Sequence, residues 1–543
     1  MDLRSLGHRA PALWLLGPFA TGLAAGKAGW APDSIGVLLV IASLAFILAA
    51  CVPRGWSVGF LTGVALIGSA YYNFTRARLA DWETLPPREA HLVVRIDRLF
   101  PIDPGMGRWS GLGRIVATEP HLSDLIGQRL YLSAAARRGT APPLRSSELA
   151  LTGVLSTLPR AASSGSFEGY LVGAGINHRL ARGRVDRVEK PASVYQRFCA
   201  GALARFDAIL RRGLDHLPEL SGVYRAMMLG QKQELSEEQD TLFLQSGTLH
   251  LFAISGLHIS AIAVAIHALL AVTRLPRGIQ FVIALGALWL YVDATGRAPS
   301  AVRAFVMMAL FTSARLLRAP GNSIAALATS AVVMLVIDPM QLFGAGFQMS
   351  YGIVAALLLF GLPLAETWKR DHGLFRNLPE AMKTRFHRWS ESLWEQMLTA
   401  VAFGLAATLV GTISGVSFFG LLTPGSFVAN LVLIPVSFLV ITGGLAALLC
   451  GLVGLWPLAI IFNHAAALVL AGIDAVLRGL VAVPGAYGHS SFRTEWLGAA
   501  AYAAMLGVMA WGYAHRWARP VGAYWPPFVL LAVLLAAGTT YGK

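Results

Sequence analysis

Long apolar runs dominate the hydrophobic pattern of this chain. Between Met397 and Ile473 there is no Asp, Glu, Lys or Arg. A membrane-spanning helix needs roughly 20 apolar residues, so this stretch alone has room for three crossings. The second half of the chain contains these candidate spans: Leu249–Val272, Ile279–Tyr291, Ser300–Ala314, Ser323–Ile337, Leu342–Leu364, Leu398–Phe419, Phe427–Leu449, Leu455–Ile473, Trp496–Trp511 and Tyr524–Ala537. Several are shorter than a full crossing, so some are expected to be re-entrant or broken helices.

The N-terminal segment is also apolar. After the basic stretch MDLRSLGHR comes PALWLLGPFATGLAAG, a pattern that a signal peptide shares. Because Ile35–Val52 and Trp56–Tyr72 follow at once, we interpret it as a short, uncleaved first span. Residues 1–76 are thus predicted to form N-terminal transmembrane helices.

The pattern changes to short alternating runs between Arg88 and Lys190. Charges return there, Pro and Gly separate the segments, and β-like runs appear: HLVVRIDRLF, GLGRIVATE, GQRLYLSAA and ELALTGVLSTL. Strands at near-regular spacing predict a small barrel or sandwich. The region contains fifteen Lys and Arg against nine Asp and Glu. An amphipathic helical connector is expected over 194–245, a transmembrane domain over 246–514, and a C-terminal apolar helix over 515–543.

Charges in the loops predict how the spans are oriented. Basic residues follow the first, third and fifth spans of the second block, at 274–277, 315–318 and 369–388, whereas Asp293 and Asp338 lie in the intervening loops. Cytoplasmic loops carry the excess of Lys and Arg. This places Thr248, and with it the β domain, outside the cytoplasm. Three N-terminal spans that start inside, with Arg4 and Arg9, give the same result.

Polar residues interrupt the predicted spans. The stretch TLHLFAISGLHIS contains His250, Ser255 and His258, and Asp293, Arg297, Arg303, His267 and His464 follow further on. Ionisable groups at membrane depth usually face a bundle interior or a cavity. On a continuous helix His250, Ser255 and His258 would form a polar stripe, interrupted at Gly256. Such groups also serve as ordinary interhelical contacts, and we assign His267 to that role.

Composition supports a membrane protein without a disulfide framework. The chain has 543 residues, of which 55% are hydrophobic and 13% charged, and its mean hydropathy is +0.59. The net charge is +15 and comes almost entirely from arginine, since six lysines are present. A basic excess has two sources here, the bias of cytoplasmic loops and a polyanionic partner that arginine forks would bind. Cys51, Cys199 and Cys450 are isolated and form no disulfide or metal motif.

Four segments together resemble the competence domain of the ComEC family. They are GTLHLFAISGLHIS, TGRAPSAVRAFVM, DPMQLFGAGFQMSYGIVAALL and GTISGVSFFGLLTPGSFVANLVLIPVSFLVI, and the resemblance extends from about Gly222 to Arg478. ELALTGVLSTLP and FEGYLVGAGINHRL, within Glu148–Lys190, resemble the family's extracytoplasmic OB-like domain. The resemblance implies an inner-membrane channel for single-stranded DNA in natural transformation. The expected fold is a polytopic α-helical membrane protein of about 10–13 transmembrane or re-entrant helices with an inserted OB-like β-barrel.

Two further expectations concern chemistry. The His-x-His-x-Asp-His motif of the metallo-β-lactamase-like domain that ends most ComEC proteins is not found in the sequence, and neither is a GxxxxGK[ST] phosphate loop. We therefore expect no enzymatic activity, no metal and no cofactor in this chain. The implied partners are the DNA strand in transit, membrane lipid, a cytoplasmic ATP-driven motor, a periplasmic DNA receptor and a separate nuclease.

The predicted site has two parts. A nucleic-acid strand carries one negative charge per nucleotide, so its path should be polar and weakly cationic, and binding must stay weak enough for the strand to move on. The predicted channel lining is His250, Ser255, His258, Asp293, Arg297, Arg303, Gln348 and Asn430. The predicted DNA-binding residues of the β domain, where a basic groove and base stacking would combine, are Arg95, Arg98, Arg108, Trp109, Arg114, Tyr131, Arg179 and Arg182. Tyr170 is a further candidate for stacking.

Two other functions use the same residues. One is a transporter of a small anionic or lipid-linked solute. The other is an intramembrane enzyme with His250 or His258 as general base and Ser255 as nucleophile, for which no third orienting residue is evident. Zinc chemistry is not expected, because a site needs three or four ligands and no third candidate lies close in sequence.

Overall fold

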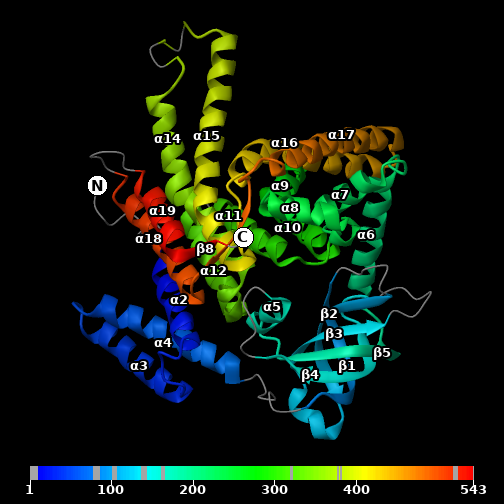
Figure 1. Ribbon diagram of the computed structural model, residues 1–543, viewed down its shortest axis with the longest axis vertical. Helices are drawn as coiled ribbons and strands as arrows, with labels where there is room; N and C mark the ends of the chain where they lie inside the picture. Colours follow the sequence, from blue (N-terminus) through cyan, green and yellow to red (C-terminus); the bar gives the residue numbers. More distant parts are fainter. Residues whose placement is uncertain are drawn as a thin grey trace.

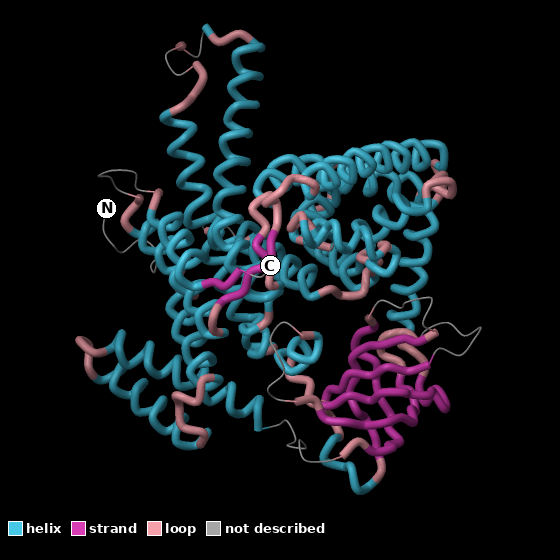
Figure 2. Tube along the Cα trace, in the orientation of Figure 1, coloured by secondary structure: helices cyan, strands magenta, loops and turns pink. Residues whose placement is uncertain are grey.

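The computed structural model comprises a β-barrel, a group of N-terminal helices and a large helical body (Figures 1 and 2). It describes residues 10–77, 86–100, 107–135, 143–159, 166–252, 254–317, 322–375, 378–379, 382–517 and 524–541. Parts of the basic loops predicted at 315–318 and 369–388 lie outside the described residues.

Within residues 10–77, three helices precede the barrel. They are α2 (Leu13–Lys27), α3 (Ile35–Cys51) and α4 (Trp56–Ala77). Helices α2 and α4 pack so closely that a Cβ on Gly22 would lie 1.8 Å from the Ala65 carbonyl oxygen. Ser69 Oγ donates to the Gly22 carbonyl oxygen at 2.7 Å across the same contact. Glycine at position 22 is therefore required by the helix packing.

The β domain is a closed barrel, as predicted. Its strands are β1 (Arg88–Leu99), β2 (Arg108–Thr118), β3 (Arg129–Ala135), β4 (Glu148–Thr157) and β5 (His178–Lys190). The strand order is β1-β2-β3-β5-β4, with β4 pairing back to β1 and β3 running parallel to β5. The 3-10 helix Pro120–Leu125 joins β2 to β3, and α5 (Phe167–Gly173) precedes β5.

Inward-facing residues alternate along the barrel strands and form a core of their own. Leu92, Ile115, Leu132 and Leu180 are members of this core. The interior is narrow, since a Cβ on Gly113 would lie 2.3 Å from Val94 Cγ1. Buried His178 has no hydrogen-bond partner at Nε2 within the described structure, and burial lowers its pKa to about 4.

The connector folds back against the helical body. It contains α6 (Val194–Arg211), α7 (Pro218–Leu229), a 3-10 turn (Lys232–Glu234) and α8 (Glu237–Gln245). Helix α7 is buried over nearly its whole length. Its Arg225 lies in ion pairs with Asp207, at 3.2 Å, and Glu234, at 2.6 Å. The charge of this buried arginine is therefore compensated.

The helical body contains the competence-like segments. In chain order its first helices are α9 (Gly256–Ala271), α10 (Arg277–Ala294), α11 (Pro299–Leu316), α12 (Ser323–Ile337), α13 (Ala345–Ala356) and α14 (Leu362–Asp371), the last two joined by a π-helical turn, Leu357–Gly361. Then come α15 (Arg385–Ser414), α16 (Ser426–Leu452), α17 (Trp456–Val481), α18 (Glu495–Ala514) and α19 (Pro526–Gly538). The short strands β6 (Leu421–Leu422), β7 (Gly488–Phe492) and β8 (Thr539–Tyr541) form a small antiparallel sheet.

The lengths and composition of these helices are those of a polytopic membrane protein. Among the described residues, six helical segments are long and apolar enough to cross a membrane, and five apolar helices of 10–17 residues accompany them. In Figure 1 the hairpin of α14 and α15 extends upward from the body, and the barrel lies at the opposite end.

Among the described residues, two ion pairs join the barrel to the helical body. Arg145, just before β4, pairs with Asp293 at the end of α10, and the Nη1–Oδ1 distance is 2.5 Å. Arg129 Nη1 lies 3.9 Å from an oxygen of Asp338, which follows α12. The loops that contain Asp293 and Asp338 therefore face the barrel. The charge pattern of the sequence predicts the same side of the membrane, outside the cytoplasm, for these loops and for the barrel.

Candidate nucleic-acid path

The first part of the predicted site lies at a break in the helix expected over Leu249–Val272. The 3-10 turn Leu249–Phe252 is separated from α9, which begins at Gly256. Ser300 Oγ, in the first turn of α11, donates to the Ile254 carbonyl oxygen at 2.7 Å. This bond satisfies a backbone acceptor that the break exposes. His250 and His258 therefore lie on different elements, and the span expected over Leu249–Val272 is broken before Gly256, where the sequence already places the interruption of the polar stripe.

His258 forms hydrogen bonds at the start of α9. The Ser255 backbone N–H donates to His258 Nδ1 at 3.2 Å, and Ser255 Oγ lies 3.0 Å from the same nitrogen. Because Nδ1 accepts the backbone N–H, the proton of the neutral ring is on Nε2. His258 is 1% exposed, and Nε2 has no partner within the described structure. The result is a buried donor without an acceptor.

Arg303, on α11, is the second unsatisfied group. It is 4% exposed, its Nη2 donates to Ser350 Oγ at 2.9 Å, and its Nε has no partner. Within the described part of the chain no carboxylate pairs with it. Withdrawing an ion from water without a counter-charge costs several kcal/mol. Arg303 is therefore an uncompensated positive charge inside the helical body.

The start of α13 increases this positive potential. A Cβ on Gly346, in the first turn of α13, would lie 3.2 Å from Arg303 Nη2. The first turn of a helix carries partial positive charge and favours anions. A guanidinium group and a helix N-terminus thus share one site, and an anion there would compensate both.

Asp293 is occupied by structural contacts, whereas Arg297 is exposed. Besides its pair with Arg145, Asp293 accepts from Gln196 Nε2 at 3.1 Å, so its carboxylate holds the barrel and α6 against α10. Arg297 is exposed in the turn before α11, with a left-handed φ of 56°. Its guanidinium lies 5.1 Å from the centre of the Trp289 ring. Of the two residues, Arg297 is the one whose charged group is accessible.

The remaining predicted lining residues are divided among local roles. Gln348 Nε2 donates to the Leu342 carbonyl oxygen at 3.0 Å, which places it at the start of α13. Asn430, on α16, has a buried Oδ1 without a partner in the described structure. His250 is exposed on its 3-10 turn. His267 is exposed on α9, and its Nδ1 bonds to the Ala263 carbonyl oxygen of the same helix at 2.8 Å.

Trp109 does not lie on the barrel surface. It is 3% exposed and belongs to the barrel core. Along β2 it has the same parity as Ile115, whereas Arg108 and Arg114 alternate with them and are more exposed. Its predicted stacking role on the surface is therefore excluded by the strand period.

Tyr131 lies on the outer face of the barrel in a group of four aromatic residues. Its ring centre is 5.3 Å from that of Phe167 and 6.0 Å from that of Phe100, and Phe167 stacks on Tyr170 at 6.1 Å. Phe167 and Tyr170 are 51% and 47% exposed. We call Phe100, Tyr131, Phe167 and Tyr170 the aromatic cluster.

Arginines border the aromatic cluster. The Arg98 guanidinium lies 5.5 Å from the Phe100 ring centre, and Arg179 Nη1 lies 3.5 Å from Glu168.

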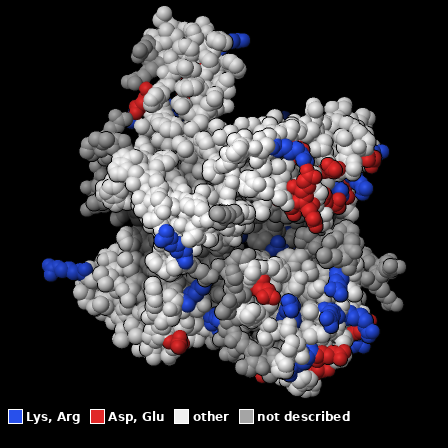
Figure 3. All heavy atoms as spheres, viewed as in Figure 1, with Lys and Arg blue, Asp and Glu red and all other residues white. Residues whose placement is uncertain are grey.

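Among the other predicted residues, Arg108 and Arg182 are exposed, Arg95 is half-buried opposite Arg114, and Arg114 lies 3.9 Å from Asp97. In Figure 3, charged side chains gather over the barrel at lower right. Exposed rings beside arginine are the composition of single-strand binding surfaces.

One short element joins the two parts of the site. Helix α5, which carries Phe167 and Tyr170, contacts the 3-10 turn Pro339–Phe343. A Cβ on Gly175, just after α5, would lie 3.7 Å from Met340 Cγ. The same turn leads directly into α13, whose Gly346 lies against Arg303. The aromatic cluster and Arg303 are therefore joined through a single turn.

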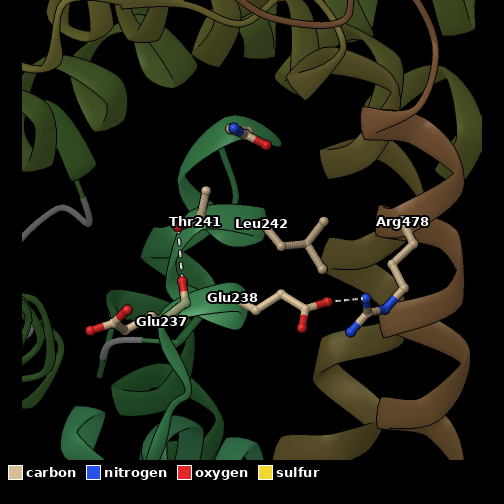
Figure 4. Close-up of a pocket in the computed structure, with 6 residues that line it drawn as sticks. Glu237, Glu238, Thr241, Leu242 and Arg478 are labelled. Atoms are coloured by element: carbon tan, nitrogen blue, oxygen red, sulfur yellow. Dashed lines mark hydrogen bonds and ion pairs between the residues drawn. The ribbon is translucent and has the colours of Figure 1, made fainter.

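A pocket between α8 and α17 lies elsewhere and has the opposite charge (Figure 4). Glu237, Glu238 and Arg478 are among its lining residues, and Arg478 pairs with Glu238 and with Asp474. This surface would repel a polyanion. Within the described ranges there is no cluster of three or more His, Cys, Asp or Glu side chains that could hold a metal.

Several residues of the site escaped the sequence prediction. Phe100 and Phe167 flank regions without regular alternation, so nothing in the pattern marked them as surface residues. Ser300, Arg145 and Gln196 act through partners 46, 148 and 97 positions away. Ser300 alone had a local signal, since it lies beside Pro299 where a helix starts.

Comparison with known proteins identifies the family. Residues 227–518 match the family described as "Competence protein", which is more than half of the chain. The chain belongs to the competence protein family. The match contains all eight residues of the predicted channel lining and extends beyond Arg478, where the resemblance in the sequence ended.

The comparisons with individual proteins cover less of this competence protein. It is 32% identical over 142 residues to ComE operon protein 3 of Bacillus subtilis (strain 168), which covers 26% of this chain and 18% of that protein. No solved structure matches it. Membership of the family implies a role in DNA uptake during transformation.

Proposed function

We propose that this protein is the channel through which single-stranded DNA crosses the bacterial cytoplasmic membrane during natural transformation. The observation that carries the proposal is the contact of α5 with the turn before α13. It connects a surface suited to unpaired bases with a buried, uncompensated arginine that is suited to phosphate. A single strand has both chemical features along its length.

The first step of the proposed path is capture by the barrel. Base stacking on aromatic rings tolerates any sequence, and arginine neutralises the backbone. The strand order β1-β2-β3-β5-β4 agrees with an OB-like domain, the class in which this combination is common. The barrel is proposed to lie outside the cytoplasm, where incoming DNA arrives.

The second step is passage beside Arg303 and the start of α13. There a phosphate group would accept from the guanidinium Nε and relieve the positive potential of the helix N-terminus. His258 Nε2–H is a second donor without a partner in the same body. A contact of a phosphate group with one arginine or with a neutral imidazole is weak enough for the strand to leave it and move on.

We assign the pulling and the cleavage of the strand to other proteins. We propose that this chain conducts DNA without cleaving it, that a cytoplasmic ATP-driven motor pulls the strand, and that a periplasmic receptor and a separate nuclease prepare it. The membrane-lipid contacts are those of its apolar helices.

The barrel step is tested by removing the aromatic cluster. Tyr131→Ala, Phe167→Ala and Tyr170→Ala are combined in the full-length protein, and binding of a fluorescent 30-nucleotide single strand is followed by anisotropy. Stacking contributes about 1–3 kcal/mol per base, so affinity should fall at least tenfold. His121→Ala, an exposed residue of the same barrel, serves as the control. Equal affinity of the triple variant and the control would exclude the aromatic cluster from the path.

The transport role is tested in cells. Deleting the gene should abolish transformation by added DNA while leaving DNA bound outside the cell intact. A deletion strain that transforms normally would contradict the proposal. A transporter of a small anionic solute would leave transformation unchanged and alter uptake of that solute.

A further inference from the structure

Helix α6 presents a row of exposed arginines that the proposed path does not include. Arg197, Arg205 and Arg211 are exposed, and so are the small residues Gly201, Ala204 and Ala208 between them. At 3.6 residues per turn these six positions lie within about 120° of the helix circumference. We call them the α6 arginine face.

The opposite side of α6 packs against the helical body. Cys199, Ile209 and Leu210 are buried there, and Ile209 and Leu210 belong to the core formed with α7, α16 and α17. The apolar side of this amphipathic helix therefore serves the fold. The α6 arginine face is the side that remains for an outside partner.

The charge on this face is not compensated. Arg197, Arg205 and Arg211 have no ion pair within the described part of the chain, and the one acid of the helix, Asp207, pairs with Arg225. The residues between the arginines leave space, since nothing lies within 4 Å of a Cβ built on Gly201. Three guanidinium groups can thus approach an extended ligand without obstruction.

Both ends of α6 are fixed. In its first turn Gln196 donates to Asp293 of α10 at 3.1 Å. At the other end Asn463 Nδ2, on α17, donates to the carbonyl oxygens of Ile209, at 2.8 Å, and Arg212, at 3.0 Å. The arginine row extends about 21 Å from Arg197 to Arg211, at 1.5 Å per residue. It therefore forms a straight track that begins next to the last strand of the barrel and ends at the helical body (Figure 1).

The position and composition of the face favour a nucleic-acid strand over lipid. A helix that lies in a membrane interface inserts its apolar face into lipid, and the apolar face of α6 is buried in protein. Exposed charged groups at membrane depth usually face water-filled cavities. Phe198, 59% exposed, lies about 20° around the helix from Arg205, so an aromatic ring accompanies the arginines as on single-strand binding surfaces.

We propose that the α6 arginine face binds the sugar–phosphate backbone of a single nucleic-acid strand and guides it from the barrel to the helical body. This proposal rests on the proposed function and names a binding surface for the same strand. The contacts are to phosphate, so they carry no sequence preference.

The salt dependence of binding tests the proposal on the full-length protein in lipid nanodiscs. Each phosphate contact on a single strand contributes about −0.7 to the slope of log K against log salt concentration. Arg197→Gln, Arg205→Gln and Arg211→Gln combined should therefore reduce the slope by about 2 for a fluorescent 30-nucleotide strand. The corresponding Lys triple variant should keep most of the slope. The exposed arginines Arg54, Arg274 and Arg277, changed to Gln together, form the matched control and should keep all of it.

The outcomes separate this proposal from the proposed function. A wild-type protein that binds no strand at any salt concentration would refute both. A wild-type protein with a steep slope that the α6 triple variant shares would overturn the role of the α6 arginine face alone.

Photocrosslinking identifies what lies on the face. A benzoylphenylalanine is placed at Ala204 and, as control, at Val264, which is 68% exposed on the apolar surface of α9. Illumination with the labelled strand bound should join the strand to position 204 and lipid to position 264. Crosslinks from position 204 to lipid only, to a second copy of the chain only, or to nothing would overturn the proposal.

Discussion

Arg303 Nη2 donates to Ser350 Oγ at 2.9 Å, and this is the hydrogen bond by which α11 holds its buried guanidinium against α13. A neutral hydroxyl compensates little of the charge, and the Nε hydrogen has no acceptor in the described structure. The pair differs from Arg225, whose guanidinium is shared by two carboxylates. Arg225 is thus compensated by carboxylates of its own fold, whereas the charge of Arg303 is left for the strand that we propose passes there.

Removing the charge of Arg303 should not destabilise the protein. An unpaired buried ion opposes folding, so Arg303→Leu should raise the free energy of unfolding by about 1 kcal/mol or more. Thermal unfolding of the purified protein in detergent, followed by tryptophan fluorescence, measures the change. Arg225→Leu is the matched comparison and should lower stability, because it leaves Asp207 and Glu234 without their partner. A large loss of stability in Arg303→Leu would show that the residue is structural.

The pair of Arg145 and Asp293 should be strongly coupled. Their side chains are 19% and 3% exposed, so removing one partner leaves a buried charge. Arg145→Met should cost about 3–5 kcal/mol, and the double variant Arg145→Met, Asp293→Leu should recover at least half of that loss. The same thermal measurement on the three variants forms a double-mutant cycle. Additive losses would mean that the two residues act independently and that the barrel is held in another way.

Acid should destabilise the barrel through His178. The pKa of this imidazole falls from 6.5 to about 4 on burial. The unfolded chain therefore binds a proton that the folded barrel does not bind between those two values, and stability falls as the pH is lowered through this window. The difference corresponds to about 3 kcal/mol. Urea unfolding of residues 88–190 at pH 7 and pH 4, with His178→Leu as the control, measures it. Equal pH dependence of the two proteins would contradict the assignment.

The membrane topology can be checked at two exposed positions. Val188, on the last barrel strand, is 58% exposed, and Met382, in the loop between α14 and α15, is 65% exposed. Cysteines at these sites, in a chain whose Cys51, Cys199 and Cys450 are replaced, should react with a membrane-impermeant maleimide from outside only at position 188. The nearby Lys383 is unsuitable because it is buried in an ion pair with Glu391. Labelling of both cysteines from one side would overturn the orientation argued from the basic loops.

The sequence predicted the parts of this fold that depend on local periodicity. Apolar length predicted the helical body, and alternation predicted β1 to β4. Strand β5 was not recognised, because Arg182, Arg184 and Arg187 make its sequence polar on the outer face. The interruption at Gly256 was visible in the sequence, but the group that stabilises the break was not, because Ser300 lies 46 residues away from its partner.

The site was predictable where a residue type was unusual for its surroundings. Arg303 stands out as a charge in an apolar helix, and its burial without a carboxylate agrees with that reading. Trp109 was predicted on the barrel surface because residue type alone does not show which face of a strand a ring occupies. Its spacing of six residues from the apolar Ile115 places both side chains on the same, buried face. The aromatic cluster could not be predicted, since Phe100 and Phe167 come together only after the barrel closes.

Uptake of labelled DNA by cells that carry Arg303 variants tests the central claim most directly. Strains with the wild-type protein, Arg303→Gln, Arg303→Lys and the control His267→Ala receive radiolabelled DNA, and nuclease-resistant label inside the cells is counted alongside membrane immunoblots. If Arg303 provides the charge that the strand meets inside the membrane, Arg303→Gln should reduce import at least tenfold at normal protein levels. Arg303→Lys should retain part of the import, and His267→Ala should retain all of it. Normal import by Arg303→Gln would contradict the account.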